Sequence, residues 1–411
     1  MNREDGAPLF DGLRRYLTRH FTAFHTPGHR GGAGLIELSG SDLLRMDLTE
    51  LTDLDGQTVQ AWRGEAEALA SELFGADRSY FLVNGATEGI LALSLSIGEP
   101  GDEVIVVRDC HLSVFHGMIL SGLKPVFISP GWLRDWNLPV LPPVEALQKV
   151  LAAHPKAKAV WVTHPSYAGV VGDLRPWADL AHRAGLPLIV DEAHGGYLSL
   201  IDSSFHEARE VADAWVHGAH KIMGSMTQTG LLHLHKGRLD EYRVNAALDW
   251  VRSTSPSYPL LCSLDLIRRR MSQDGKQAYQ RVAEEASILR QRLAAAGISA
   301  LSVQDGPYRY DPMKLVLTFI SQGIGGYEAQ ERLRGEHRIQ AEYADGENIV
   351  FFLSPFQSRE DLERLFKATQ TLVSDSQRPA AGRMAPPAFS SETLAMSPRE
   401  AAFSPHETVE V

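Results

Sequence analysis

Strand-like apolar runs alternate with helix-like segments through the first half of this chain. Runs such as SYFLV (79–83), DEVIVV (102–107), KAVWVT (158–163) and PLIVD (187–191) are each followed by a helical pattern or by a glycine-containing turn. Strands that alternate with helices in this way usually pair in parallel within one sheet. The order therefore predicts an α/β fold with a mostly parallel sheet wrapped by helices.

A second, smaller α/β pattern follows the first. Beyond Leu264 the sequence predicts a long helix that bridges two domains, and strand and helix signals then alternate again from DPMKL (311–315) onward. We find no internal repeat. The expected organisation is an N-terminal helix with a TPGH loop (1–45), a large domain (46–265), a small α/β domain (266–373) and a tail rich in Pro, Ala and Ser (374–411).

Composition limits the classes of protein that this sequence can encode. The chain has 411 residues, is 44% hydrophobic and 22% charged, and carries a formal net charge of −11, which argues against nucleic acid or an anionic membrane as a partner. We read no signal peptide and no membrane-spanning run. The two cysteines, Cys110 and Cys262, have no metal-ligand spacing, so we expect a cytoplasmic enzyme without a metal site.

Polar residues stand just past several predicted strands, and two of them form a recognisable pair. Asp191 ends the run PLIVD, and Lys221 follows a second strand thirty residues later. A pyridoxal phosphate enzyme needs this combination, because the lysine amine holds the cofactor aldehyde as a Schiff base and the aspartate pairs with the protonated ring nitrogen. A single lysine at a strand end is more often a solvated surface charge, so the assignment depends on its neighbours.

Two further positions fit the needs of a phosphorylated aromatic cofactor. The turn Gly85-Ala86-Thr87 opens a predicted helix, and a helix N-terminus favours a bound anion. His111 follows another strand, where its ring has the right position to stack on the cofactor. Both features have plainer explanations, since such a turn is often only a turn and a loop histidine is often only a cap.

The order of these motifs resembles the Orn/Lys/Arg decarboxylases, in particular their shorter bacterial members. The segments that carry the resemblance run through nearly the whole chain: FHTPGHRGG, DLTELTDLDGQ, FLVNGATEGILAL, RDCHLSVFHG, VTHPSYAGVVGDL, IVDEAHGG, HKIMGSMTQTGLLHL, STSPSYPLLCSLD, DPMKL and SPREAAFSPHETV. The TPGH and SPSYPL segments are the most specific. The resemblance implies the fold of PLP-dependent transferases of the aspartate aminotransferase type, pyridoxal 5'-phosphate as cofactor, and a homodimer or larger homo-oligomer.

The resemblance also assigns roles to individual residues. Lys221 would bind the cofactor aldehyde, Asp191 would pair with its ring nitrogen, and His194 would lie near the reacting carbon. The remaining cofactor contacts would come from Gly85, Ala86, Thr87, His111, Ala193 and His220. For the substrate, family position points to Glu50, Asp53 and Asp55 in DLTELTDLDG and to Ser255 and Tyr258 in STSPSY, while a solvated polar loop is an equally good explanation of the three carboxylates.

The sequence also departs from the family pattern. Where the family commonly has Ser-Thr-His-Lys, this chain has Gly218-Ala219-His220-Lys221, and Ala86 replaces a usual serine. The loss of hydroxyl donors to a dianion favours weaker cofactor binding. The family continues past its SPREAAF segment into a C-terminal domain, whereas this sequence stops at Val411, so we expect most of that domain to be missing.

The expected reaction is α-decarboxylation of a basic amino acid, with arginine first, then lysine and ornithine, on family analogy alone. Two alternatives remain open. An aminotransferase would use the same lysine and aspartate but needs an arginine to hold the substrate carboxylate, and Arg309 and Arg334 are available for that. A truncated or degenerate relative would bind cofactor without turnover.

Overall fold

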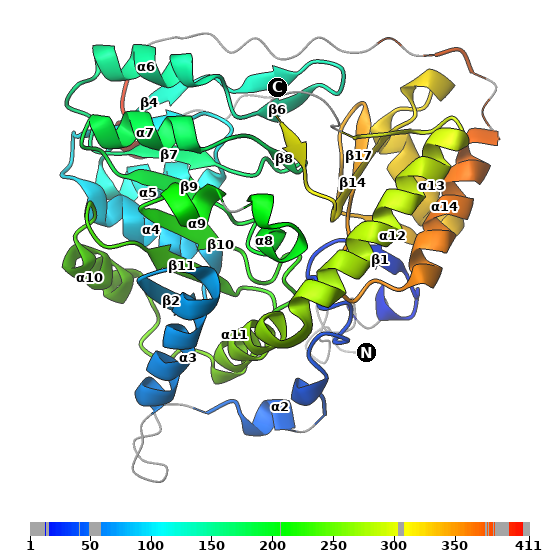
Figure 1. Ribbon diagram of the computed structural model, residues 1–411, viewed down its shortest axis with the longest axis horizontal. Helices are drawn as coiled ribbons and strands as arrows, with labels where there is room; N and C mark the ends of the chain where they lie inside the picture. Colours follow the sequence, from blue (N-terminus) through cyan, green and yellow to red (C-terminus); the bar gives the residue numbers. More distant parts are fainter. Residues whose placement is uncertain are drawn as a thin grey trace.

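The chain forms a large mixed sheet and a smaller antiparallel sheet, each covered by helices (Figure 1). The computed structural model describes residues 13, 16–40, 42–48, 59–205, 207–302, 308–374, 376, 378–380, 382 and 394–405. In spatial order the large sheet consists of β2 (Arg78–Leu82), β11 (Gly230–Leu234), β10 (Ala214–His217), β9 (Leu188–Asp191), β7 (Val160–Thr163), β3 (Glu103–Val107) and β4 (Lys124–Ile128). β11 alone runs opposite to the other six strands, which confirms the predicted mostly parallel sheet.

Alternate residues of the central strands point to opposite faces of the large sheet, as the period of a strand requires. Val160 and Val162 of β7 join one apolar cluster, while Trp161 between them joins the other. The first face is covered by α6 (Val144–Ala153), α7 (Arg175–Arg183) and α9 (Glu207–Val211). The second is covered by α4 (Gly85–Ile97), α5 (Leu112–Ser121) and α10 (Glu241–Val251). Both faces of the strands are therefore buried.

The small sheet lies on the other side of the molecule in Figure 1, beside three helices. Its strands in spatial order are β12 (Ser299–Ala300), β14 (Lys314–Thr318), β17 (Asn348–Phe352) and β16 (Tyr343–Ala344). The helices packed with them are α12 (Lys276–Ala295), α13 (Gly326–His337) and α14 (Arg359–Ser374). These elements match the predicted second α/β pattern, while the domain boundaries themselves stay a prediction.

The predicted bridging helix begins earlier than expected and is not regular throughout. It starts as α11 (Tyr258–Arg270), passes through a single π-helical turn (Met271–Gly275) and continues as α12. The expectation that it starts beyond Leu264 was wrong, because Pro259 lies in the first turn and begins the helix there. In Figure 1 the nearly continuous helix α11–α12 runs from the large sheet to the small one.

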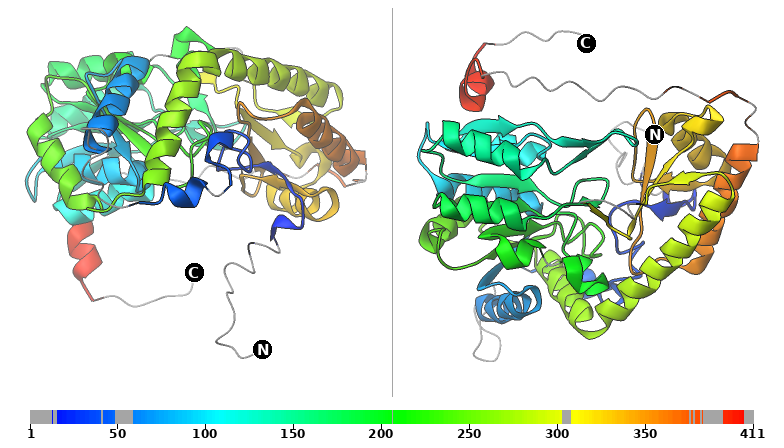
Figure 2. Two further views of the ribbon diagram at one scale, coloured as in Figure 1. Left: turned by 90° about the horizontal axis from the view of Figure 1, so that it is seen from below. Right: turned by 45° about the horizontal axis from the view of Figure 1, so that its top comes forward.

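The two ends of the chain pack against distant elements. β1 (Thr22–Phe24) pairs in parallel with β15 (Ile339–Ala341), so the N-terminal segment is fastened to the small-sheet half. The helix α15 (Pro398–Phe403) packs against α5 (Figure 2), and a capping box formed by Ser397 and Glu400 begins it. No helix in the described part of the chain is long and apolar enough to cross a membrane.

The other described elements are short, apart from α3. They are α2 (Asp42–Arg45), α3 (Val59–Phe74), α8 (Leu198–Ile201), β5 (Gly131–Leu133), β6 (Leu138–Val140), β8 (Val170–Val171) and β13 (Arg309–Tyr310). The run AWRGEAEALASELF (61–74) lies within α3. The helix expected in the N-terminal segment falls largely outside the described residues.

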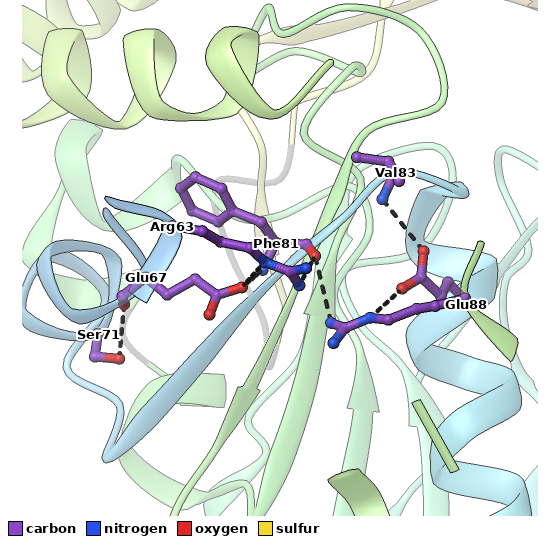
Figure 3. A network of polar contacts seen from close by, with 7 residues as sticks. Arg63, Glu67, Ser71, Phe81, Val83 and Glu88 are labelled. Atoms are coloured by element: carbon purple, nitrogen blue, oxygen red, sulfur yellow. Dashed lines mark hydrogen bonds and ion pairs between the residues drawn. The ribbon is translucent and has the colours of Figure 1, made fainter. Parts of the chain in front are cut away.

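A buried ion pair fixes the turn between β2 and α4 (Figure 3). The Glu88 carboxylate accepts hydrogen bonds from the backbone N–H groups of Val83 and Asn84 at 3.2 and 3.0 Å. Arg252 donates to the same carboxylate at 2.8 Å and to the carbonyl of Phe81 at 3.4 Å. Glu88 is only 1% exposed, so the positive charge of Arg252 is needed to stabilise its buried carboxylate.

Replacement of Arg252 by methionine is expected to destabilise the fold by about 3–5 kcal/mol, because it leaves the Glu88 carboxylate buried and unpaired. The measurement is the midpoint of urea unfolding, which should fall while the dependence of the unfolding free energy on urea concentration stays unchanged. The control is Arg243→Met, which breaks the exposed pair with Glu99 and should change stability by less than about 1 kcal/mol. Equal losses in the two variants would contradict the assignment.

Candidate active site

The strand register gathers polar groups at one edge of the large sheet. Asp191, the last residue of β9, lies opposite Thr163 of β7 and Val216 of β10 in the parallel register. Asp191 has the same orientation as Ile189, whose side chain lies in the cluster beneath α4 and α5. The Asp191 carboxylate is 3% exposed and therefore faces the helix N-termini that carry Gly85 and His111.

Lys221 lies in the turn after β10 and meets His194 from the turn after β9. The Lys221 Nζ is 2.6 Å from the His194 Nε2, so the sequence-predicted lysine and histidine are in direct contact. Burial lowers the pKa of Lys221, while Asp191 and Glu342 oppose that shift. Burial also lowers the pKa of His194, and the nearby cations Lys221 and Lys314 lower it further. A neutral His194 is thereby able to accept a proton from Lys221.

Asp191 is a buried carboxylate that still needs a cation. Its Oδ1 accepts a hydrogen bond from the backbone N–H of Ala193 at 3.1 Å. Burial raises the pKa of Asp191, against the opposing effects of Lys221, the Ala193 hydrogen bond and His111. A protonated pyridine nitrogen would supply the missing positive charge, as the predicted role requires.

His111 caps a helix beside the Asp191–Lys221 pair. It is the N-cap of α5, and its Nδ1 accepts from the backbone N–H of Ser113 at 3.2 Å. The plainer explanation of this histidine as a cap is thus correct. Its pKa is lowered by burial and is also affected by the charges of Asp191 and Lys221, so the capped ring lies beside both groups.

The predicted phosphate turn forms the first turn of α4. Gly85 has φ +73°, and an added Cβ there would meet open space. Beneath the turn, a Cβ on Gly230 would come within 2.7 Å of the Ala86 nitrogen, so only glycine allows β11 to approach so closely. Thr87 is half-buried in the same turn, and His220 is held by its Nδ1 contact of 2.9 Å to the Thr229 carbonyl.

Several buried polar atoms around Asp191 and Lys221 have no hydrogen-bond partner within the described part of the chain. They are Oδ1 of Asp109, Oγ1 of Thr163 and Nδ1 of His194. Burial, together with the charge of Asp191, raises the pKa of Asp109 to about 6. An aromatic cofactor with a ring nitrogen, a phenolic oxygen and a phosphate fits a wall with unpartnered donors and acceptors of this kind.

The TPGH loop closes over Lys221, a contact that the motif alone did not reveal. The backbone N–H of Gly28 donates to the carbonyls of His220 and Lys221 at 3.0 and 2.9 Å. A Cβ on Gly28 would lie 2.1 Å from the Lys221 carbonyl oxygen, so no larger residue fits. The glycine of this loop therefore fixes the backbone of Lys221.

A carboxylate that the sequence reasoning missed faces the same site. Glu342, between β15 and β16, accepts a hydrogen bond from the Thr26 N–H at 2.7 Å and one from the Tyr167 hydroxyl at 2.9 Å. The Tyr167 ring in turn lies 4.9 Å from the His194 ring, centroid to centroid. Only its contacts with segments far away in sequence identify Glu342, so no local pattern signals it.

The substrate residues expected from the sequence stay a prediction. Glu50, Asp53 and Asp55 lie outside the described residues. Ser255 is exposed and Tyr258 begins α11, and in the described contacts neither is hydrogen-bonded to Lys221 or His194.

Comparison with known proteins identifies the family. The family model described as the Orn/Lys/Arg decarboxylase major domain matches residues 7–306. The chain belongs to this family. The arginine decarboxylase of Bacillus subtilis is 32% identical over 98% of this chain and 85% of its own length, and that of Halalkalibacterium halodurans is 32% identical over 100% and 86%.

Solved structures confirm the predicted fold. The lysine decarboxylase of Francisella novicida superposes with a TM-score of 0.71 at 21% identity, covering 89% of this chain and 60% of the other. The cysteine desulfurase of Thermococcus onnurineus gives a TM-score of 0.66 at 15% identity, covering 89% of this chain and 98% of the other. Family membership also confirms pyridoxal phosphate as the cofactor and gives no support to the aminotransferase alternative. Arg309 and Arg334, the two arginines that an aminotransferase could use to hold the substrate carboxylate, are both exposed.

Gly28→Ala is expected to weaken binding of pyridoxal phosphate about tenfold or more, because the added methyl group forces the Lys221 backbone to move. The measurement is a titration of cofactor-free protein followed by visible absorbance. Gly64→Ala is the matched control, since its Cβ in α3 meets nothing within 4 Å. Unchanged affinity in Gly28→Ala would show that the loop does not fix the lysine.

Proposed function

We propose that this protein is a pyridoxal phosphate-dependent decarboxylase that removes the α-carboxyl group of a basic amino acid, arginine first. The observation that carries the proposal is the contact of Lys221 with His194 beside the buried Asp191, in a member of the Orn/Lys/Arg decarboxylase family. Arginine is favoured because relatives of about 30% identity over nearly the whole chain bear the name arginine decarboxylase.

The residues of the site would hold the cofactor as follows. Lys221 would bind its aldehyde carbon, Asp191 its ring nitrogen and the turn Gly85–Thr87 its phosphate, while His111 and Ala193 would flank the ring. Bound there, the cofactor supplies an acceptor for the electron pair that the departing carboxylate leaves on the α-carbon.

The protein groups supply proton transfer and orientation. Asp191 keeps a proton on the ring nitrogen, because its buried charge is stabilised by that cation. His194, neutral through burial, receives the proton of the Lys221 amine when the substrate amine replaces it. Lys221 or His194 then returns a proton to the α-carbon after carbon dioxide leaves, and the aromatic rings of Tyr167 and Phe352 next to His194 limit access of water.

Glu342 is our candidate for the group that binds the distal cation of the substrate. Its charge raises the pKa of Lys221 and its carboxylate is linked to His194 through Tyr167, so it lies close to both predicted catalytic groups. A partly buried carboxylate pairs well with a guanidinium or ammonium group.

We also propose that the enzyme works as a homodimer or larger homo-oligomer in the cytoplasm. Support for assembly comes from large apolar side chains left exposed on α10, where Tyr242 is 80% and Trp250 is 71% exposed. The two free thiols, Cys110 and Cys262, are consistent with a reducing compartment.

The experiment that tests the proposal is a visible spectrum with added pyridoxal phosphate, followed by carbon dioxide release from arginine, lysine and ornithine. A cofactor band with release from one of them supports the enzyme and names its substrate. A band without release supports the degenerate alternative, and formation of a keto acid would support the aminotransferase.

Lys221→Ala is expected to abolish both the visible band of the bound cofactor and carbon dioxide release, because no other group replaces the amine that binds the aldehyde. Absorbance and a carbon dioxide assay measure the two effects. Lys276→Ala at the exposed start of α12 is the control and should leave both unchanged. A persistent band in Lys221→Ala would make the lysine assignment wrong.

Glu342→Gln is expected to raise the KM for arginine about tenfold or more, since a charged hydrogen bond to the substrate is lost. The inhibition constant of citrulline, a neutral isostere of arginine, should change much less. Glu328→Gln, which breaks a surface pair with Arg378 in the same half of the molecule, is the control. Equal changes for arginine and citrulline would mean that Glu342 only holds the loops together.

A further inference from the structure

The DPMKL segment (311–315) has no role in the proposed reaction, yet its lysine, Lys314, lies in the protein interior. Lys314 begins β14 and is 0% exposed. Lysine side chains are almost never fully buried unless they are paired, because burial of an ammonium group is costly. Its contacts therefore explain why a lysine is present at this position.

The Lys314 side chain reaches across to the turn that follows β7. Its Nζ donates to the backbone carbonyls of Ser166 and Tyr167 at 3.3 and 2.8 Å. It passes directly under Gly169, where an added Cβ would lie 2.9 Å from the Lys314 Cδ. The small-sheet half thus holds this turn of the large-sheet half through one ammonium group.

The same turn supplies the wall behind His194. The Tyr167 and Phe352 rings lie 4.9 and 5.5 Å from the His194 ring. The Lys314 Nζ lies 5.9 and 5.0 Å from the centroids of those two rings, while the Lys221 Nζ contacts His194 directly. The two aromatic rings therefore contact His194 and lie close to the Lys314 ammonium group.

The charges in this region influence one another. Burial lowers the pKa of Lys314 to about 7, while Asp311 and Glu342 raise it and Lys221 lowers it. Burial lowers the pKa of His194 most strongly, and the cations that lower it further are Lys221, Lys314, His220 and His111. A positive Lys314 thus favours the neutral form of His194.

We propose that Lys314 is a positioning residue for the reaction: it holds the Ser166–Tyr167 turn so that Tyr167 packs on His194 and reaches Glu342, and its positive charge keeps His194 free to accept a proton from Lys221. This inference rests on the proposed function. The inference adds to the proposed function a role for Lys314 that acts through Tyr167 and His194 and not through contact with the substrate.

The alternative is that Lys314 only stabilises the packing of the two halves. Arg290 offers a matched comparison, because its guanidinium donates to the carbonyls of Pro312 and Lys314 at 3.1 and 2.7 Å and so holds the same segment from the other side. Among its described hydrogen bonds, none reaches the Ser166–Tyr167 turn. A purely structural role predicts the same behaviour for both positions.

The test compares Lys314→Met with Arg290→Met by histidine NMR of the cofactor-free protein and by the pH dependence of kcat/KM for arginine. Removal of the Lys314 charge should raise the pKa of His194, and the acid limb of the rate profile should move to higher pH, because protonated His194 cannot accept a proton. Arg290→Met should shift neither. Lys314→Gln is the second variant, since its amide can still donate to a carbonyl and so preserve the fold.

A double-mutant cycle tests the link through Tyr167. The losses of kcat in Lys314→Met and Tyr167→Ala should be clearly less than additive when the two are combined. An unchanged pKa of His194 in both Lys314 variants, or fully additive losses, would overturn the proposal. If the wild-type protein released no carbon dioxide from any basic amino acid, the proposed function would fail, while the NMR comparison would still decide whether Lys314 controls His194.

Discussion

The parallel pairing of β9 with β7 and β10 determines where each reactive group lies. Because three neighbouring strands run in the same direction, the residues that follow them share one edge of the sheet. The alternation of β9 then turns Asp191 toward the face covered by α4 and α5, whose first turns carry Gly85 and follow His111. A one-residue shift in the register of β9 would turn Asp191 to the opposite face and separate it from Lys221.

The sheet edge alone does not complete the site, because distant segments close around the lysine. The contacts form a ring that starts and ends at Lys221 and passes through His194, Tyr167, Glu342, Thr26 and Gly28. One part of the ring belongs to the N-terminal loop and another to the turn between β15 and β16. These contacts form only when the N-terminal loop and the turn between β15 and β16 both pack against the large sheet. Folding of the two halves is therefore coupled to assembly of the site.

The sequence was sufficient to predict site residues that a local pattern marks, but not residues that reach the site only when distant segments pack together. The positions of Asp191, Lys221 and His111 follow from strand ends, which periodicity reveals. Glu342 and Lys314 make their contacts with residues more than a hundred positions away. Nothing around Glu342 distinguishes it from a solvated charge, and the DPMKL segment supports the family resemblance without showing that its lysine is buried. The start of the bridging helix at Tyr258 was misjudged because the proline in its first turn was not used as a start signal.

The departure from the family pattern at Gly218 has a steric reason in this protein. A Cβ there would lie 2.9 Å from the Ala193 carbonyl and about as close to the Lys221 side chain, at 3.0 Å from its Cδ. A serine would therefore push the lysine turn away from the end of β9, and with it Lys221 away from His194. Gly218 therefore lets the lysine turn approach the end of β9 closely, next to the place where the Lys221 amine contacts His194 at 2.6 Å, and the expected loss of one hydroxyl donor accompanies this close packing.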